Sequence, residues 1–258
     1  MRDDLVKKLN RLIRALEIYL IEYVEKKDIR KKSPDIDELD IDYILSFNYT
    51  HTFPKLYEVS ERAKKEKIDS FDYIHGETKI KNTIKSNNMV LGIDEYLSKK
   101  RKDKDVEFIA FKKFYQRIHK QTGCKYKDWI NAIIQENTEY IENIRQQQID
   151  FDKNRGMGEE GEKTINQLKQ LKDNPPRHDL YIFGHSLDIT DRDILRDLIL
   201  NDNVYTTIYY LNKDVLGQQI ANLVKVIGQD ELIKRTGGSA RTIKFKQQKD
   251  MVPIEIHT

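Results

Sequence analysis

The chain has a single cysteine, Cys124, among its 258 residues. One cysteine cannot form an intrachain disulfide, so the disulfide-rich secreted class is excluded and a reducing compartment is indicated. Long apolar runs are missing too, since no window approaches the roughly 18 apolar residues of a membrane-spanning helix. The charged start of the chain does not look like a signal peptide. We therefore expect a soluble, cytoplasmic protein with no membrane partner.

A strong charge bias is also absent. The 46 basic and 43 acidic residues give a formal net charge of only +3. This net positive charge is too small to indicate binding to a polyanion, which argues against nucleic acid as the partner. With 38% hydrophobic and 34% charged residues the chain is in the globular range, and its length allows one large domain or two small ones.

Several catalytic and ligand-binding motifs are lacking. The glycine-rich segment 155–161 follows no predicted strand and has no Gly-Lys-Ser/Thr ending, so it predicts a helix–helix turn rather than a phosphate loop. The run 184–186 is Gly-His-Ser, but Asp188 stands where a nucleophile elbow needs its second glycine. Cys124 is alone and no histidine pair has the spacing of zinc ligands on a helix, so no metal is predicted.

What the chain does contain is an alternation of short apolar strands with helices. This alternation predicts an α/β fold with a largely parallel, Rossmann-like sheet and helices on both faces. Strands are predicted at residues 42–47, 71–74, 89–91, 180–183, 204–211 and 241–245. Helices are predicted mainly at residues 3–27, 105–149, 162–171, 191–200, 213–227 and 229–235. The long helical stretch predicts an insertion over the edge of the sheet.

The first helix has an apolar stripe. Apolar residues recur every three or four positions from Leu5 to Val24, the pattern of an amphipathic helix. This stripe favours a helix that packs on a core, with a partner-binding helix as the alternative. A polar linker with Pro34 follows. We expect residues 1–34 to form this helix and linker, and residues 35–258 the α/β domain with a helical insertion at about 100–172.

Four of the predicted strands end in polar or glycine residues. The carboxyl ends of parallel strands meet at one edge of a sheet, which is where open α/β sheets bind ligands. We therefore expect these groups to line one crevice, although up to 140 residues separate them. They are Asn48 and Thr50, His75 and Gly76, Gly92 and Asp94, and finally Gly184, His185, Ser186 and Asp188.

Each of these groups also has a structural alternative. Asn48 and Thr50 are common turn and cap residues, and Asp94 and Asp188 suit helix N-termini. Gly184 predicts a positive φ or a close approach of the backbone to a ligand, and a capping box at Thr190 would begin the following helix. The other histidines, at positions 51, 119, 178 and 257, lie in surface-like surroundings and are expected to have no special role.

The motifs and their order resemble the AbiH family of bacterial phage abortive-infection proteins. The resemblance covers about residues 40 to 245 and includes an Asn-Tyr-Thr after a strand, a His-Gly, and a Leu-Gly-Ile-Asp. It also includes Phe111-x-x-Phe114 and the stretch from Phe183 to Asp191. That family is in turn remotely similar to sirtuin-like NAD-binding folds, which share an asparagine after a strand, a His-Gly and a late Gly-x-Ser.

The resemblance implies defence against phage, with NAD⁺ as the substrate of a glycohydrolase. By this resemblance Asn48 positions water or the ribose and His75 is the general base. Cleavage of the nicotinamide–ribose bond passes through an oxocarbenium-like state, as glycoside hydrolysis does. The dinucleotide would be held by Thr50, Gly76, Gly92, Asp94, Gly184, His185, Ser186 and Asp188.

One motif departs from the family pattern. Family members usually begin with a strand that leads into Gly-Asn-Gly-Phe-Asp, the turn expected to cradle the pyrophosphate, and this sequence contains no such motif. We therefore expect the chain to lack the first βα unit. A second interpretation follows, in which the chain is a non-catalytic nucleotide-binding or protein-interaction module with a protein partner or a second copy of itself. A nucleic-acid effector is a third interpretation and rests only on scattered lysines.

Overall fold

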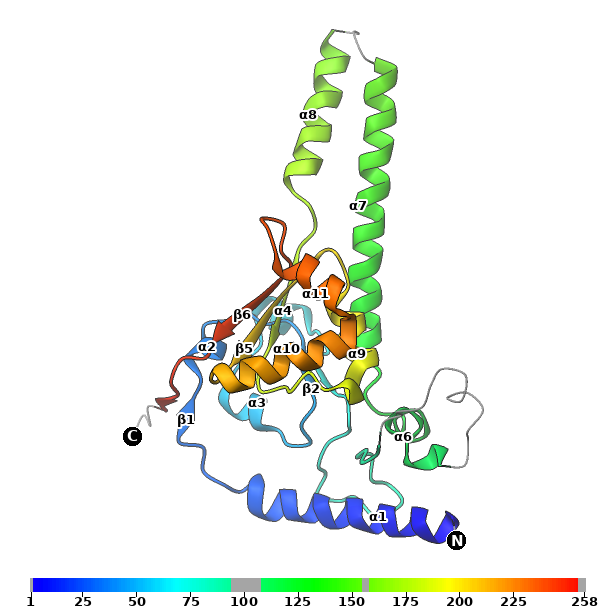
Figure 1. Ribbon diagram of the computed structural model, residues 1–258, viewed down its shortest axis with the longest axis vertical. Coiled ribbons are helices and arrows are strands. Elements are labelled where there is room, and N and C mark those ends of the chain that lie inside the picture. The colour runs from blue at the N-terminus through cyan, green and yellow to red at the C-terminus, as the bar shows by residue number, and fades with distance from the viewer. Residues whose placement is uncertain (1, 94–107, 155–157, 255–258) are drawn as a thin grey trace. The chain divides into compact units, whose positions relative to one another are not determined.

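The computed structural model describes residues 2–93, 108–154 and 158–254. The chain forms two compact units, and each is described here by itself (Figure 1). The first unit comprises residues 1–126 and 248–258, and the second comprises residues 127–247. The domain division expected from the sequence, with a boundary at residue 34, remains a prediction.

The first unit is built from short strands and helices around one parallel pair. Its elements are α1 (Arg2–Tyr19), a π-helical turn (Leu20–Val24), β1 (Lys31–Lys32), α2 (Pro34–Asp37), β2 (Ile44–Ser46), α3 (Thr52–Leu56), α4 (Glu61–Glu66), β3 (Phe71–Tyr73), a 3-10 turn (Ile109–Phe111), α6 (Lys113–Lys120) and β7 (Val252–Pro253). β2 and β3 pair in parallel, with Ile44 opposite Phe71 and Ser46 opposite Tyr73. Parallel pairing requires a crossover connection, which α3 and α4 provide.

One buried carboxylate holds α1 on this unit. Glu17 is fully buried and accepts hydrogen bonds from the backbone N of Lys79 (3.0 Å) and from Asn82 Nδ2 (2.6 Å). Asn87 and Arg14 also donate to it. A buried charge is costly unless it is paired and hydrogen-bonded, so these contacts tie the helix to the loop at residues 79–87.

The C-terminal end of the chain returns to the first unit. β7 pairs antiparallel with β1, so that Lys31 lies opposite Pro253. Beside this pair the backbone N of Lys249 donates to Asp35 Oδ2 at 2.7 Å, and Asp35 is 1% exposed. The first unit is therefore closed by two segments that are more than 200 residues apart in the sequence.

The second unit holds a three-stranded parallel sheet and two long helices (Figure 1). Its elements are α7 (Tyr126–Asn154), α8 (Glu159–Asp173), β4 (His178–Ile182), a 3-10 turn (Ile189–Asp191), α9 (Arg192–Ile199), β5 (Val204–Tyr210), α10 (Lys213–Ile227), α11 (Gln229–Thr236) and β6 (Ile243–Gln247). The strand order is β4-β5-β6, and both pairings are parallel.

The core of the second unit lies on one face of this sheet. Ile182, Ile208 and Ile243 come from its three strands and pack against α9, α10 and α11. The helices contribute Leu195, Ile199, Leu223, Val226, Ile227 and Leu232. Right-handed crossovers in a strand order that does not reverse place their helices on the same face. α9, α10 and α11 therefore lie on one face of this sheet, and helices on both faces remain a prediction.

The structure confirms a mixed α/β fold with small parallel sheets, but two local predictions are wrong. Residues 89–91 form no strand, because Val90 N donates to His75 O (2.7 Å) and Leu91 N to the Gln116 side chain (3.2 Å). The predicted capping box at Thr190 is replaced by Asp188, whose Oδ1 accepts from Thr190 N at 3.0 Å. Among the described residues, no helix combines the length and apolarity needed to cross a membrane.

Candidate functional site

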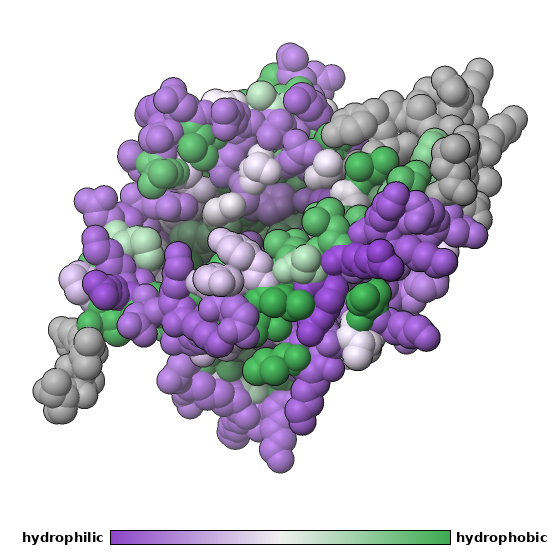
Figure 2. Space-filling model, turned by 90° about the horizontal axis from the view of Figure 1, so that it is seen from below, coloured by the Kyte–Doolittle hydropathy of each residue, from purple (hydrophilic) through white to green (hydrophobic). Residues whose placement is uncertain are grey.

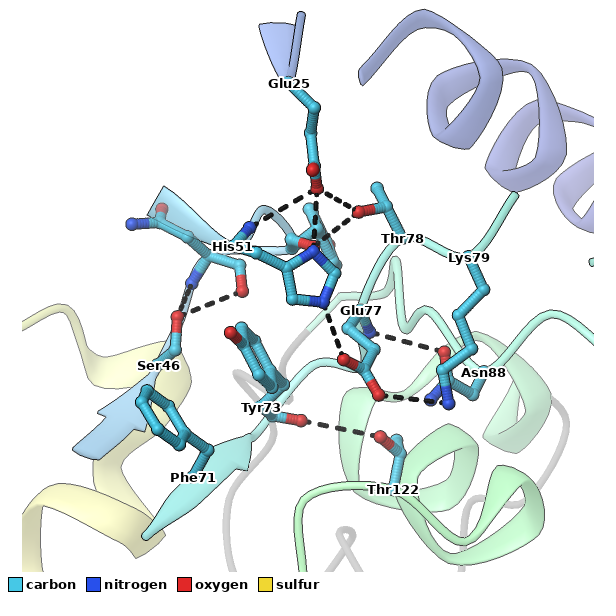
Figure 3. A network of polar contacts seen from close by, with 12 residues as sticks. Glu25, Ser46, His51, Phe71, Tyr73, Glu77, Thr78, Lys79, Asn88 and Thr122 are labelled. Carbon is cyan, nitrogen blue, oxygen red and sulfur yellow. Dashed lines mark hydrogen bonds and ion pairs between the residues drawn. The ribbon is translucent and has the colours of Figure 1, made fainter. Parts of the chain in front are cut away.

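The carboxyl ends of β2 and β3 hold two polar turns side by side (Figure 3). The first turn covers residues 47–51 and the second residues 74–78. Thr78 joins them, because its backbone N donates to Tyr49 O at 2.9 Å, while its hydroxyl, which lies 3.2 Å from the same oxygen, donates to Glu25. The parallel register of the strands therefore brings two of the four predicted strand ends together.

His51 lies at the centre of this edge, between two carboxylates (Figure 3). Its Nδ1 is 2.9 Å from Glu25 Oε1, and its Nε2 is 2.8 Å from Glu77 Oε2. The backbone N of His51 also donates to Glu25 Oε1, at 3.3 Å, and Tyr73 packs edge-on against the imidazole with ring centroids 5.2 Å apart. We call Glu25, His51 and Glu77 the Glu–His–Glu network.

Both carboxylates of the network are stabilised in their ionised form. Burial opposes the charge of Glu25, but hydrogen bonds from Thr78, His51 and Lys55 lower its pKa to about 2. Burial likewise opposes the charge of Glu77, and hydrogen bonds from His51 and Lys79 lower its pKa below the usual value. An ionised carboxylate only accepts, so His51 can donate to both partners only as an imidazolium.

Tyr73 supplies an un-ionised phenol next to the network. Burial raises the pKa of Tyr73 to about 12, and the neighbouring charges of Glu77 and Glu25 act in the same direction. The phenol therefore keeps its proton across the physiological pH range. The edge thus combines two negative charges, an imidazole and a neutral hydroxyl within one small region.

Asn48 is the predicted site residue that is open to solvent on this edge. It is exposed, and its backbone N and O both contact Ser46 Oγ at 3.2 Å. This small turn fixes the backbone and leaves the side-chain amide in solvent. Thr50, two residues on, is half-buried, with its hydroxyl 3.2 Å from that of Thr52.

His75 and Gly76 lie beneath the surface. His75 is 5% exposed, and its ring packs edge-on against Phe47 with centroids 5.8 Å apart. Gly76 has a φ of +79°, and a Cβ there would lie 2.3 Å from the backbone O of Asn88. The glycine is therefore required by close backbone packing, which covers this turn with the segment that follows residue 87.

The third predicted strand end lies only partly within the described residues. A Cβ on Gly92 would lie 2.5 Å from the backbone O of Phe111, so this glycine permits a close contact between two loops. Asp94 lies outside the described residues. The roles of both residues in ligand binding remain predictions.

The fourth predicted strand end belongs to the second unit. Gly184 has a φ of +62°, as expected at a strand end, and no atom lies within 4 Å of a Cβ built on it. His185 Nδ1 accepts from Leu187 N at 2.9 Å, and its Nε2 is 3.6 Å from Asp191 Oδ2. Ser186 is exposed. Asp188 caps the 3-10 turn, and its role in nucleotide binding remains a prediction.

The four strand ends are therefore divided between the two units, and their meeting in one crevice remains a prediction. Sequence reasoning also missed His51, to which it gave no role. The only local signal was its place in the turn that directly follows a strand. The described residues contain no cluster of three or more side chains able to hold a metal ion.

A family profile described as bacteriophage abortive infection AbiH matches residues 1–211 of the chain. The chain belongs to the AbiH family. The part of this AbiH protein that is matched begins with α1 and ends after β5, so it includes the Glu–His–Glu network and the β4 turn. No curated protein and no solved structure matches the chain at a significant level.

Proposed function

We propose that this AbiH protein acts in abortive infection by hydrolysing the nicotinamide–ribose bond of NAD⁺ at the β2–β3 edge. The observation that carries the proposal is the pair of polar turns held together behind two parallel strands. That is the edge of an α/β sheet at which ligands bind. In this proposal the small parallel sheets derive from a sirtuin-like, Rossmann-like core.

The chemistry of the edge supports this reaction. Loss of nicotinamide leaves an oxocarbenium-like ribose, whose developing positive charge a nearby carboxylate stabilises. Hydrogen bonds from His51 and Lys79 keep Glu77 ionised, and its side chain is 25% exposed. The exposed amide of Asn48 is available to order water or the ribose.

In this proposal His75 remains the general base suggested by the family resemblance. His75 is 5% exposed in the free protein, so it reaches a substrate only when substrate binding moves the residues that cover it. Apo geometry does not by itself exclude a catalytic base. Thr50, Gly76, Gly92 and Asp94 are the proposed dinucleotide contacts in the same part of the chain.

Gly184, His185, Ser186 and Asp188 are proposed as nucleotide contacts in the second unit. The space around Gly184 would admit a phosphate or ribose close to the backbone. A Gly184→Ala variant tests this contact separately, because an added methyl group would meet the ligand but no atom of the free protein. Weaker NAD⁺ binding by a fully folded variant is the expected result, and unchanged binding would remove these residues from the proposal.

The direct test is nicotinamide release from NAD⁺ by the purified protein, alone and with phage lysate. Asn48→Ala, His75→Ala and Glu77→Gln should each lower the rate by about 100-fold or more, the range for lost acid–base or electrostatic groups. The control is Asn174→Ala, which removes another exposed amide at the end of α8 and should leave the rate unchanged. Full activity in all three site variants would refute the assignment.

The alternative function is a non-catalytic nucleotide-binding or protein-interaction module. The burial of His75 favours it, as does the lack of a glycine-rich phosphate loop in the sequence. Isothermal titration with NAD⁺ and ADP-ribose discriminates between the two functions. Binding without nicotinamide release supports a nucleotide sensor, and no binding together with a stable complex with another protein supports an interaction module.

A further inference from the structure

α1 and the π-helical turn that follows it carry two adjacent rows of side chains, and one of these rows is buried against the first unit. The packed row contains Ile13 and Glu17, which are 1% and 0% exposed. The second row, which we call the outer row, is entirely apolar or aromatic and consists of Leu5, Leu9, Leu12, Leu16, Tyr19 and Tyr23. Figure 2 shows apolar side chains exposed among hydrophilic ones on one face of the molecule.

Four of the six side chains in the outer row are exposed. Leu5 is 42%, Leu12 58%, Tyr19 54% and Tyr23 64% exposed, whereas Leu9 and Leu16 are half-buried. Exposed apolar residues are ordinary when scattered singly, but a continuous row of six marks an interaction surface. Tyr19 and Tyr23 already stack on each other, with ring centroids 5.5 Å apart.

The spacing of the row fits one kind of partner. Its members alternate steps of four and three residues, which is the a/d seam of a two-stranded coiled coil. An 18-residue helix such as α1 is about 27 Å long, enough for a short helix pair. A partner helix with the same seam would bury the row by knobs-into-holes packing.

We propose that this partner is α1 of a second copy of the chain, running antiparallel. The positions that flank the seam on one side are Lys8, Ala15 and Glu22. In an antiparallel pair centred on Ala15, Lys8 faces Glu22 of the partner subunit, and the symmetry of the pair repeats this contact. The small Ala15 lies next to Ala15 of the partner subunit, where the two helices come closest.

The apolar layers of this pair are complementary as well. Leu12 lies opposite Leu16 of the partner subunit at the centre, and on either side Leu9 lies opposite Tyr19 of the partner subunit. The outermost layer sets Leu5 against Tyr23 of the partner subunit. Each layer therefore joins an a position to a d position, as antiparallel coiled coils require, and each tyrosine hydroxyl can reach water at the rim.

The charged pairs need little rearrangement. In the single chain Lys8 forms an exposed ion pair with Asp4 at 2.8 Å, and Glu22 forms one with Lys26. Exposed pairs of this kind contribute little to stability, so exchanging them for contacts across the dimer costs little. The charges thus favour the antiparallel direction, and the apolar row drives association.

Pairing would also act on the candidate site. The helix that carries the outer row holds Glu17 on its packed side and leads through the π-helical turn to Glu25 of the Glu–His–Glu network. A dimer that forms only when α1 is helical stabilises this helix by mass action. The inference does not depend on NAD⁺ hydrolysis, since it concerns assembly alone.

Sedimentation equilibrium of the full chain across a concentration range tests the proposal. We expect a dimer, and we expect Leu12→Glu to raise its dissociation constant by about tenfold or more, because it places two charges in the central layer. The matched control is Ile118→Glu on α6, where an even more exposed apolar residue (72%) receives the same charge. This control should leave the dimer intact.

Charge exchange tests the direction of the helices. Lys8→Glu should weaken the dimer through repulsion by Glu22 of the partner subunit, and adding Glu22→Lys should restore it. In a Cys124→Ser background, Ala15→Cys should be joined across the dimer by a short bis-maleimide. Failure of both the restoration and the cross-link in a protein that still dimerises would overturn the antiparallel arrangement.

Two results would overturn the pairing itself. One is a monomer at all concentrations, which would mean that another part of the same chain or a different protein covers the outer row. The other is a dimer that Leu12→Glu leaves intact. If Leu12→Glu loses its helical circular dichroism, Tyr19→Glu replaces it, since Tyr19 is also in the row and 54% exposed.

Discussion

Two glycines with similar backbone angles illustrate how strongly the surroundings of a residue decide its role. Gly76 and Gly184 have φ values of +79° and +62°. A Cβ on Gly76 would lie 2.3 Å from the backbone O of Asn88, whereas a Cβ on Gly184 would meet no atom within 4 Å. In the free protein the first glycine is therefore needed for packing as well as for its backbone angle, and the second for its backbone angle alone.

Alanine substitutions should separate these two roles. Gly184→Ala should lower the free energy of unfolding by about 1–2 kcal/mol, the cost of a left-handed residue with a side chain. Gly76→Ala should cost clearly more, because backbone must shift as well. Urea unfolding followed by circular dichroism measures both values. Equal losses would show that the contact with Asn88 is not a constraint.

The Glu25 carboxylate should make stability depend on pH in a defined window. Its folded pKa of about 2 lies below the 4.5 of an unperturbed glutamate, so its contribution is complete above about pH 4.5 and is lost as the pH falls towards 2. The difference in unfolding free energy between wild type and Glu25→Gln should be constant from pH 7 to pH 5 and shrink below pH 4.5.

Glu66→Gln serves as the control for this experiment, because Glu66 is 56% exposed and, within the described part of the chain, pairs only with Arg62, at 3.9 Å. Its difference from wild type should be small at every pH. A Glu25→Gln difference that stays constant down to pH 3 would contradict the network described above.

At the scale of single elements, the attachment of α1 to the first unit depends on one residue, Glu17, more than on the apolar stripe of the helix. Glu17 accepts from four donors, on Arg14 and on the loop at residues 79–87. Glu17→Gln would point an amide N–H₂ at these donors and should cost about 2–4 kcal/mol. Urea unfolding measures the loss, and Glu66→Gln, which changes an exposed glutamate at the end of α4, should change stability by less than about 0.5 kcal/mol.

The elements with strong local patterns could be predicted from the sequence. The apolar runs around Leu45 and Ile208 form strands β2 and β5. The apolar periodicity near the start of the chain corresponds to α1 and its π-helical turn. Residues 89–91 look like the same kind of run but form no strand. Contacts from residues 75 and 116 satisfy their backbone, and no local pattern reveals such distant partners.

The candidate site could be predicted only in part, because some of its contacts also come from residues that are distant in the sequence. The turn residues Asn48 and His75 follow strands, and that position is visible in the sequence. The importance of His51 is not visible, because each of its carboxylate partners, Glu25 and Glu77, is 26 residues away in a different element. Strand order is likewise a long-range property, so the order β4-β5-β6 could not be predicted from local patterns.

At the scale of the whole molecule, the two units differ in how they are assembled from the chain. The second unit is one continuous segment, residues 127–247, with its own apolar core. The first unit needs both residues 1–126 and the segment from residue 248. We expect the fragment 127–247 to fold alone and unfold cooperatively in urea. A fragment without a cooperative transition would show that its core is insufficient by itself.

The complementary deletion should affect the first unit. Removing residues 248–258 takes away β7 and the contact between Lys249 and the buried Asp35. Limited proteolysis should then cut within residues 1–126 at protease concentrations that leave the full chain intact, while residues 127–247 stay protected. Identical digestion patterns would mean that the C-terminal segment contributes nothing to the first unit.

The pairing of β1 with β7 also sets an order of events during translation. The β1 strand and Asp35 leave the ribosome early, but their partners near Lys249 follow only after the whole of residues 127–247. At about 5–20 residues per second, synthesis of the 214 residues from Asp35 to Lys249 takes roughly 11–43 s. The nascent chain therefore carries the Glu–His–Glu network in a unit that stays unclosed until the segment around Lys249 and β7 has been made.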